Sequence, residues 1–260
     1  MSDVESLAMK LGFIGAGSMA YALARGVGEP VLVYDPETQR AERLAAEVRG
    51  AVSASNAELA DAVDLVVLCH KPAQLEKVAA EVDGQARAVV SIMAATPTEA
   101  IEAAYPGVPV YRFIPNLPAE VGRGVLCYAP GSLAADGPEQ EILTLFGRAG
   151  SVIPLDEPLM EPAMALMSCG PAFLALVAEA MAEAGARHGL DPHQATRLVV
   201  ETMAGTAAYL DANGLEPGEM RARVATPGGV TEKGLGVLEE SGLRGSFDRA
   251  IDLIVEAAVR

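Results

Sequence analysis

Short apolar stretches alternate with helical ones over the first 155 residues, and this alternation constrains the fold more than any other feature. Strands that are apolar on both sides occur in parallel sheets covered by helices on both faces. Residues 1–155 are therefore predicted to form an α/β domain around a doubly wound parallel sheet. The predicted strands are Lys10–Ile14, Val31–Tyr34, Leu65–Leu68, Ala88–Ile92, Pro109–Phe113, Val125–Tyr128 and Ser151–Ile153.

From about Asp156 the strand pattern stops and only helical patterns follow. Residues 156–260 are predicted to form a second, all-helical domain that dimerises. A small, alanine-rich helical domain has little core of its own, so at least a homodimer is expected. The predicted helices are Glu157–Arg187, Pro192–Asn213, Thr231–Glu240 and Phe247–Arg260.

The charge and composition exclude several classes of function. A formal net charge of -16 argues against nucleic acid and anionic membranes as partners. Three cysteines without CxxC spacing indicate a reducing, cytoplasmic location, and residues 1–8 lack the pattern of a signal peptide. The uncharged run Pro162–Ala178 contains Gly and Pro and is predicted to be too short and broken to span a bilayer.

A glycine-rich run, Gly15-Ala16-Gly17-Ser18-Met19-Ala20, follows the first strand and opens the first helix. Gly15 permits a tight turn, Gly17 allows the backbone to approach a pyrophosphate, and Ala20 allows close helix–sheet packing. In this strand–turn–helix context the G-x-G-x-x-A pattern predicts dinucleotide binding, the alternative being a purely structural turn.

The end of the second strand bears on the choice of dinucleotide. Asp35 can accept hydrogen bonds from ribose hydroxyls and repels a 2′-phosphate, which favours NADH over NADPH. Arg40 and Arg43 could instead bind a 2′-phosphate if they turned inward. Asp35 could also be only a turn or N-cap residue before Pro36.

Two further loops follow strands at the carboxyl edge, where α/β sheets bind ligands. In Cys69-His70-Lys71-Pro72, Lys71 is predicted to contact the cofactor or to be a solvated turn lysine. His70 is interpreted as a hydrogen-bonded turn residue, the alternative being a histidine that titrates near a substrate. The loop around Asn116 lies between two prolines, so it either presents Asn116 to the cofactor or is simply a rigid turn.

The segment Thr226-Pro227-Gly228-Gly229-Val230-Thr231 leads straight into a predicted helix. Its two glycines expose backbone N–H groups at that helix start, and Thr231 adds a hydroxyl, so the segment is predicted to bind a carboxylate. The alternative is a simple N-capping turn. Metal and hydrolase motifs are absent from the sequence, and no metal is expected.

Taken together, these segments resemble the pyrroline-5-carboxylate reductase family along almost the whole chain. The resemblance is carried, in the family's order, by KLGFIGAGSMAYAL, LCHKP, RFIPNLPAE, SCGPAF and VATPGGVTEKGLGVLEESGLR. It implies a Rossmann domain, a helical domain that interlocks two subunits, and reduction of 1-pyrroline-5-carboxylate to proline by NADPH or NADH, the last step of proline biosynthesis. The chain departs from the family's usual residues at His70, Thr96, Leu117 and Cys169.

The resemblance also implies site residues. The expected cofactor contacts are Gly15, Ala16, Gly17, Ser18, Met19, Asp35, Asn56, Lys71, Pro72 and Asn116. The expected substrate contacts are Gly228, Gly229, Val230 and Thr231, with the N–H groups of Gly229, Val230 and Thr231 on the carboxylate. The catalytic residue is expected to be Thr231, through a hydroxyl contact with the ring nitrogen.

Two alternatives remain at the level of the sequence. The chain could reduce another small cyclic imine, or a hydroxyacid, as other members of the same superfamily do. The absence of lysine from Glu157–Ala186 counts against a hydroxyacid dehydrogenase. The second alternative is a non-catalytic dinucleotide-binding protein.

Overall fold

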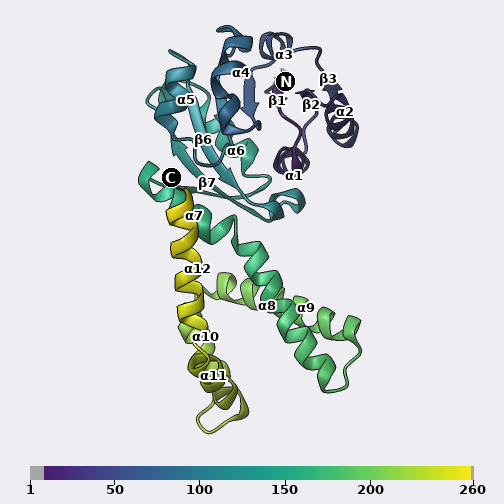
Figure 1. Ribbon diagram of the computed structural model, residues 1–260, viewed down its shortest axis with the longest axis vertical. Coiled ribbons are helices and arrows are strands. Elements are labelled where there is room, and N and C mark those ends of the chain that lie inside the picture. Colours follow the sequence, from purple (N-terminus) through teal and green to yellow (C-terminus); the bar gives the residue numbers. More distant parts are fainter. Residues whose placement is uncertain (1–8, 259–260) are drawn as a thin grey trace, which may run out of the picture. The chain divides into compact units, whose positions relative to one another are not determined.

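A computed structural model describes residues 9–258, and the chain divides into two compact units (Figure 1). Within the described residues, unit 1 comprises residues 9–169 together with Ala257 and Ala258, and unit 2 is Gly170–Glu256. The predicted end of the last helix at Arg260 lies outside the described residues.

Unit 1 is built on a sheet that has eight strands within the described residues, in the order β3-β2-β1-β4-β5-β6-β7-β8. Every predicted strand is present, and β3, which was not predicted, pairs with β2 at the edge. Because β3 is only two residues long and both are exposed, it has no apolar pattern to detect. The strands are β1 Leu11–Ile14, β2 Val31–Tyr34, β3 Ala51–Val52, β4 Leu65–Leu68, β5 Val89–Ser91, β6 Val110–Pro115, β7 Gly124–Pro130 and β8 Gly150–Pro154.

Strands β1 to β6 pair in parallel in the order 3-2-1-4-5-6, which confirms the predicted α/β fold with a doubly wound Rossmann sheet. Strand β7 runs antiparallel to β6, and β8 pairs in parallel with β7. The β6–β7 link contains only the short turn η2 (Leu117–Val121), which is too short for the crossover that a parallel neighbour requires.

Helices cover both faces of this sheet (Figure 1). Successive side chains of a strand point to opposite faces, so Leu65 and Val67 of β4 join one apolar cluster while Val66 and Leu68 join another. The first cluster includes residues of α1 (Ser18–Val27), α2 (Thr38–Glu47) and α6 (Glu139–Phe146). The second includes residues of α3 (Asn56–Ala62), α4 (Leu75–Val82) and α5 (Thr98–Ala104).

The first helical segment after residue 156 packs on the sheet of unit 1. The turn η4 (Glu157–Leu159) leads into α7 (Met160–Met167), where Met160 is fully buried in a small cluster with Ile114, Cys127 and Ala129. The uncharged run Pro162–Ala178, which was predicted to be broken, is interrupted between α7 and α8, which begins at Gly170. The prediction that residues 156–260 act as one dimerisation and substrate-binding domain stays a prediction.

Unit 2 is entirely helical in the described residues, as expected. Among its apolar side chains only Ala182 and Ala195 are buried. Many large apolar side chains are instead exposed, among them Leu174, Leu176, Leu198, Val200, Val237 and Leu253. The helices are α8 Gly170–Arg187, α9 Pro192–Asn213, α10 Pro217–Val224, α11 Val230–Glu240 and α12 Leu243–Ala258, of which α10 was not predicted.

One stretch within the described residues, Glu157–Arg187, is by length and composition long and apolar enough to cross a membrane, and an 18-residue window of it has a mean hydropathy of 1.6. This span is longer than the run judged too short from the sequence. The criterion rests on length and composition alone, and a core helix of a soluble protein meets it equally well. It is therefore only weak support for a membrane location.

The aromatic packing on β6 provides a test of the fold. Phe113 is fully buried, and its ring centroid lies 4.8 Å from those of both Tyr128 and Phe146. Phe113→Ala should lower the free energy of unfolding by about 3–5 kcal/mol, because it leaves a cavity between two rings. Val121→Ala on the exposed turn η2 is the control and should change it by less than about 0.5 kcal/mol in urea unfolding. Equal effects of the two changes would contradict this packing.

Candidate functional site

The glycine-rich turn between β1 and α1 is held by backbone contacts with both neighbouring strands. Gly15 N–H donates to Tyr34 O (2.8 Å), and Cys69 N–H donates to Ile14 O (2.8 Å). Gly15 has φ +101°, and a Cβ there would lie 2.8 Å from the carbonyl carbon of Cys69. Only glycine fits this position without strain, as the sequence predicted.

Gly17 serves a different purpose in the same turn. A Cβ on Gly17 would meet no atom of the protein within 4 Å, so packing does not require glycine there. Gly17 is the N-cap of α1 and provides no side-chain cap, and the N–H groups of Ser18 and Met19 at the first turn have no helical partner. The turn therefore offers an open cradle and unpaired N–H groups that fit a pyrophosphate.

Asp35 at the end of β2 fastens this turn. Its Oδ2 accepts a hydrogen bond from Ala16 N–H (2.8 Å), and its Oδ1 accepts one from Glu37 N–H (2.8 Å). Each carboxylate oxygen has a further lone pair, so these bonds leave capacity for ribose hydroxyls. Asp35 is thus a turn residue in this structure, and its predicted contact with the cofactor stays a prediction.

Two clefts flank the turn. One, of about 520 Å³, is lined by Gly15, Gly17, Asp35, Asn56 and Lys71 among others. The second has a similar volume and is lined by residues that include Ser18, Tyr21, Arg40 and Arg43. The structure thus brings the predicted Gly15–Ser18, Asp35, Asn56 and Lys71 together around one turn.

The two arginines beside the second cleft differ in their contacts. Arg40 forms an ion pair with Glu37 (2.9 Å), which offsets its charge. The Arg43 guanidinium lies 5.3 Å from the centroid of the Tyr21 ring, in a cation–π contact. Neither arginine contacts Asp35 in this structure.

Asn56 is the most buried of the predicted cofactor contacts that carry a polar side chain. Its Nδ2 donates to Glu81 Oε2 (2.7 Å), while its Oδ1 is buried without a hydrogen-bond partner. A buried, unpaired amide oxygen costs free energy unless a ligand donates to it. This orphaned atom at the lining of the cleft fits a site that a polar ligand completes.

His70 is a hydrogen-bonded turn residue in the structure, as interpreted from the sequence. Its Nδ1 lies 3.0 Å from Lys71 O, and since a carbonyl only accepts, Nδ1 carries the proton. Burial lowers the pKa of His70 and outweighs the opposite effect of this backbone hydrogen bond. Burial therefore favours the neutral form of the ring. Lys71 and Pro72, which follow it, are exposed.

Asn116 lies at the end of β6 and joins three segments of unit 1. Its Nδ2 donates to Met167 O (2.9 Å) at the end of α7, and its Oδ1 accepts from Val125 N–H (2.9 Å) on β7. Both ends of the buried amide are thus engaged within the protein. The structure gives Asn116 a structural role, and its contact with the cofactor remains a prediction.

The predicted carboxylate site in unit 2 lies at the start of α11. Gly229 N–H donates to Thr226 O (2.9 Å), and Gly228 N–H donates to Glu232 Oε2 (2.7 Å). The Gly229 N–H expected to hold the carboxylate is therefore engaged within the turn. Val230 and Thr231, at the first helical positions and exposed, have the N–H groups that a helix start leaves unpaired.

Glu232 was not anticipated from the sequence, although a Glu three residues after the N-cap is a known helix-start signal.

No group of three or more metal-binding side chains occurs in the part of the chain that the structure describes.

The two glycines of the N-terminal turn make a matched test. Gly15→Ala should lower the free energy of unfolding by more than about 1 kcal/mol, because of its positive φ and the contact with Cys69. Gly17→Ala should fold normally but bind NADH and NADPH more weakly, because its methyl group fills the cradle. Thermal unfolding and a dinucleotide fluorescence titration distinguish the two. An unchanged dinucleotide affinity in Gly17→Ala would show that the open space above Gly17 is not part of the dinucleotide site.

Comparison with known proteins agrees with this geometry. Residues 157–260 match the family model for pyrroline-5-carboxylate reductase dimerisation, and residues 10–95 match the model for NADP oxidoreductase, coenzyme F420-dependent. The chain is 32% identical to a pyrroline-5-carboxylate reductase of Synechocystis sp. over 254 residues, which covers 94% of this chain and 95% of that protein.

Solved structures show the same similarity. The 1-pyrroline-5-carboxylate reductase of Streptococcus pyogenes has a TM-score of 0.86 and 26% identity, with 96% of this chain and 98% of that one covered. The Plasmodium falciparum pyrroline carboxylate reductase with NADP bound has the same fold, with a TM-score of 0.83, 24% identity, and 96% and 97% coverage. Because the 32% identity to the Synechocystis protein extends over nearly the full length of both chains, the chain belongs to the pyrroline-5-carboxylate reductase family.

Proposed function

We propose that this protein reduces 1-pyrroline-5-carboxylate to L-proline, with NADH or NADPH as the hydride donor. The observation that carries the proposal is the similarity to pyrroline-5-carboxylate reductases over 94% of the chain. The open turn at Gly17 and the helix start at Val230 and Thr231 add chemistry that suits the two ligands.

The reaction adds one hydride to the imine carbon and leaves one proton on the ring nitrogen, while the dinucleotide is oxidised. The nicotinamide supplies the hydride when the dinucleotide is bound. A protonated imine already accepts hydride well, so the protein mainly orients the reactants and excludes water. The substrate contacts expected from the sequence, Gly228, Gly229, Val230 and Thr231, include no strong acid or base, which fits this kind of catalysis.

In unit 1, the N–H groups of Ser18 and Met19 are suited to hold the pyrophosphate, above the backbone of Gly15, Ala16 and Gly17. Asn56 Oδ1, buried without a partner, is suited to accept a hydrogen bond from the ligand. Lys71 and Pro72 line the same edge, and the charge of Lys71 suits the anionic dinucleotide. Asn116 would act by holding β7 and α7 in place.

In unit 2, the N–H groups of Val230 and Thr231 are suited to hold the substrate carboxylate at the positive end of α11. Gly228 and Gly229 shape the turn, with Gly228 at φ +75°. The Thr231 hydroxyl would contact the ring nitrogen and orient the imine for hydride transfer.

For the dinucleotide we propose a preference for NADH. Asp35 places a carboxylate at the end of β2, and this charge opposes a 2′-phosphate. The charge of Arg40 is already paired with Glu37.

We also propose that the protein is a cytoplasmic homodimer. The dimerisation model covers residues 157–260, which include all of unit 2. In unit 2 many large apolar side chains are exposed, and only Ala182 and Ala195 are buried among the apolar residues. Burial of these apolar side chains between subunits would stabilise the helices.

An assay of NADH and NADPH oxidation with 1-pyrroline-5-carboxylate tests the function directly. Thr231→Ala should lower kcat about tenfold or more with unchanged dinucleotide affinity, because it removes the hydroxyl at the ring nitrogen. Thr231→Ser, which keeps the hydroxyl, should stay near the wild type. Thr144→Ala on α6 is the control, since its hydroxyl bonds only to Gln140 O. Dinucleotide binding without turnover by the wild type would refute the reductase.

The dinucleotide preference has its own test. The wild type should have a higher kcat/KM with NADH than with NADPH, and Asp35→Ser should lower that ratio about tenfold or more, because the repulsion is removed. Asp61→Ser on the exposed side of α3 is the control and should leave the ratio unchanged. A wild type that prefers NADPH would show that Arg40 or Arg43 decides the preference instead.

A further inference from the structure

Arg112 is a charged side chain in the middle of an apolar strand. It lies on β6 between Tyr111 and Phe113, all three are 0–1% exposed, and it is the largest of the fully buried side chains. Burial of a guanidinium is costly unless carboxylates pair with it in good geometry. The position therefore calls for an explanation beyond packing.

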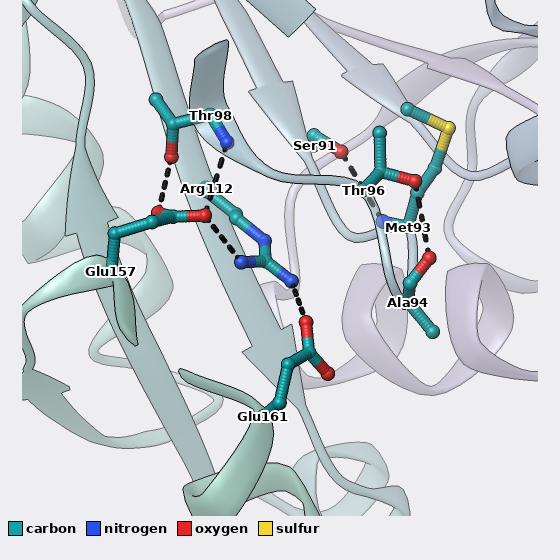
Figure 2. Close-up of polar contacts among 8 residues, drawn as sticks. All are labelled: Ser91, Met93, Ala94, Thr96, Thr98, Arg112, Glu157 and Glu161. Carbon is teal, nitrogen blue, oxygen red and sulfur yellow. Dashed lines mark hydrogen bonds and ion pairs between the residues drawn. The ribbon is translucent and has the colours of Figure 1, made fainter. Parts of the chain in front are cut away.

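Two carboxylates from neighbouring turns of one helical segment meet this guanidinium (Figure 2). Arg112 Nη1 donates to Glu157 Oε1 and Nη2 donates to Glu161 Oε1, both at 2.5 Å. Each Nη group holds a different carboxylate, so the planar fork fixes the direction as well as the distance of both contacts. Arg112 thus ties η4 and α7 to the centre of the sheet.

Glu157 extends the network to a third element. Its carboxylate accepts hydrogen bonds from Thr98 N–H (3.1 Å) and from Thr98 Oγ1 (2.5 Å) at the start of α5 (Figure 2). The N-cap residue of α5 is Pro97, which has no side chain that can cap the helix, so Glu157 caps it from a distant part of the chain. Burial raises the pKa of Glu157, but the hydrogen bonds from Thr98 and the charge of Arg112 outweigh this and lower it overall.

The loop before α5 depends on this anchor. It leads from β5 through Ala95, whose φ of +50° is unusual for a residue other than glycine, to Thr96, which is 5% exposed. Only short local hydrogen bonds, Thr96 Oγ1 to Ala94 O and Met93 N–H to Ser91 Oγ, hold the loop from within. The loop lies at the carboxyl edge of β5, in the half of a doubly wound sheet that receives the second nucleotide of a dinucleotide.

The network contains two carboxylates and one guanidinium, and two of its buried atoms, Arg112 Nε and Glu161 Oε2, have no hydrogen-bond partner. An arrangement selected for stability alone would pair these atoms or replace the charges with apolar side chains, which often stabilises a protein. The charges instead fix the orientation of three elements, which are η4, α7 and the start of α5.

We propose that Arg112 is a positioning residue for hydride transfer, which acts through Glu157 on the β5–α5 loop and through Glu161 on α7. The inference rests on the proposed reductase function. The cleft lined by Asp35 and Asn56 contains no member of the network, so the dinucleotide contacts made in that cleft should not depend on Arg112. The rate of hydride transfer should depend on Arg112, because a misplacement of the reactants by about 1 Å can lower the rate on the order of 100-fold.

The test compares Arg112→Lys, Glu157→Gln and Glu161→Gln with the wild type. In Arg112→Lys and Glu157→Gln, kcat should fall about tenfold or more, while the dinucleotide Kd should stay within about twofold of the wild type. The primary isotope effect on kcat, measured with dinucleotide deuterated at C4, should become larger. Glu161→Gln keeps the shape of the side chain and leaves the charge of Arg112 balanced by Glu157. This variant is therefore expected to fold even if Arg112→Lys does not. It should show the same changes to a smaller extent.

The matched control is the surface ion pair of Arg148 and Glu29, changed in the same way by Arg148→Lys and Glu29→Gln. These variants should keep the kcat and isotope effect of the wild type. An unchanged kcat in the network variants would overturn the proposal. So would a parallel fall of kcat, dinucleotide affinity and folded fraction with an unaltered isotope effect, because that is the result of a merely structural role.

Hydrogen exchange separates this proposal from the reductase function itself. Exchange at the Thr98 amide and along α7 should become faster in Arg112→Lys and stay unchanged in Arg148→Lys, whether or not the protein reduces an imine. If the wild type has no turnover, the role in hydride transfer fails together with the proposed function. If turnover is present but exchange in Arg112→Lys is unchanged, only the positioning proposal fails.

Discussion

The central strands of unit 1 are buried on both faces, and the arrangement of the rest of the unit depends on this constraint. Phe13 on β1 and Val66 and Val67 on β4 are all 0–1% exposed, with helices packed above and below them. A strand without an exposed side has no place for polar side chains along its length. Polar groups therefore gather where the strands end, and the glycine-rich turn, Asp35, Lys71 and Asn116 all lie at or just beyond such an end.

The same constraint explains how the turn keeps its shape. Its bonds come from the ends of neighbouring strands: Tyr34 O accepts from Gly15 N–H, and Asp35 accepts from Ala16 N–H. The close approach of Gly15 to Cys69 leaves no room for a side chain. A turn held from both sides keeps its N–H groups and the space above Gly17 ready for a ligand, which lowers the entropic cost of binding.

Arg112 is a charged residue within one of the buried strands, and its pairing explains why unit 1 extends beyond the last strand. A charge inside an apolar strand can be tolerated only if carboxylates are brought to it, and these come from η4 and α7. Asn116 and Ser168 add hydrogen bonds at the other end of α7. Both ends of this helix are therefore fastened to the sheet, and the chain leaves unit 1 only after Cys169, although its strand pattern has stopped well before.

The sequence by itself determined the features that depend on local patterns. Continuous apolar runs predicted the central strands, and the spacing of Gly15, Gly17 and Ala20 predicted the turn, because periodic burial and backbone freedom are properties of short segments. Segments without such a pattern were missed, namely the exposed β3 and the polar α10. Only the tertiary structure decided the direction of β7, the partners of Asp35 and Asn116, the engagement of Gly229 with Thr226, and the link between Arg112 and Glu157, 45 residues apart. Hydrogen bonds between distant segments depend on which elements meet in space, and no local pattern of residues contains that information.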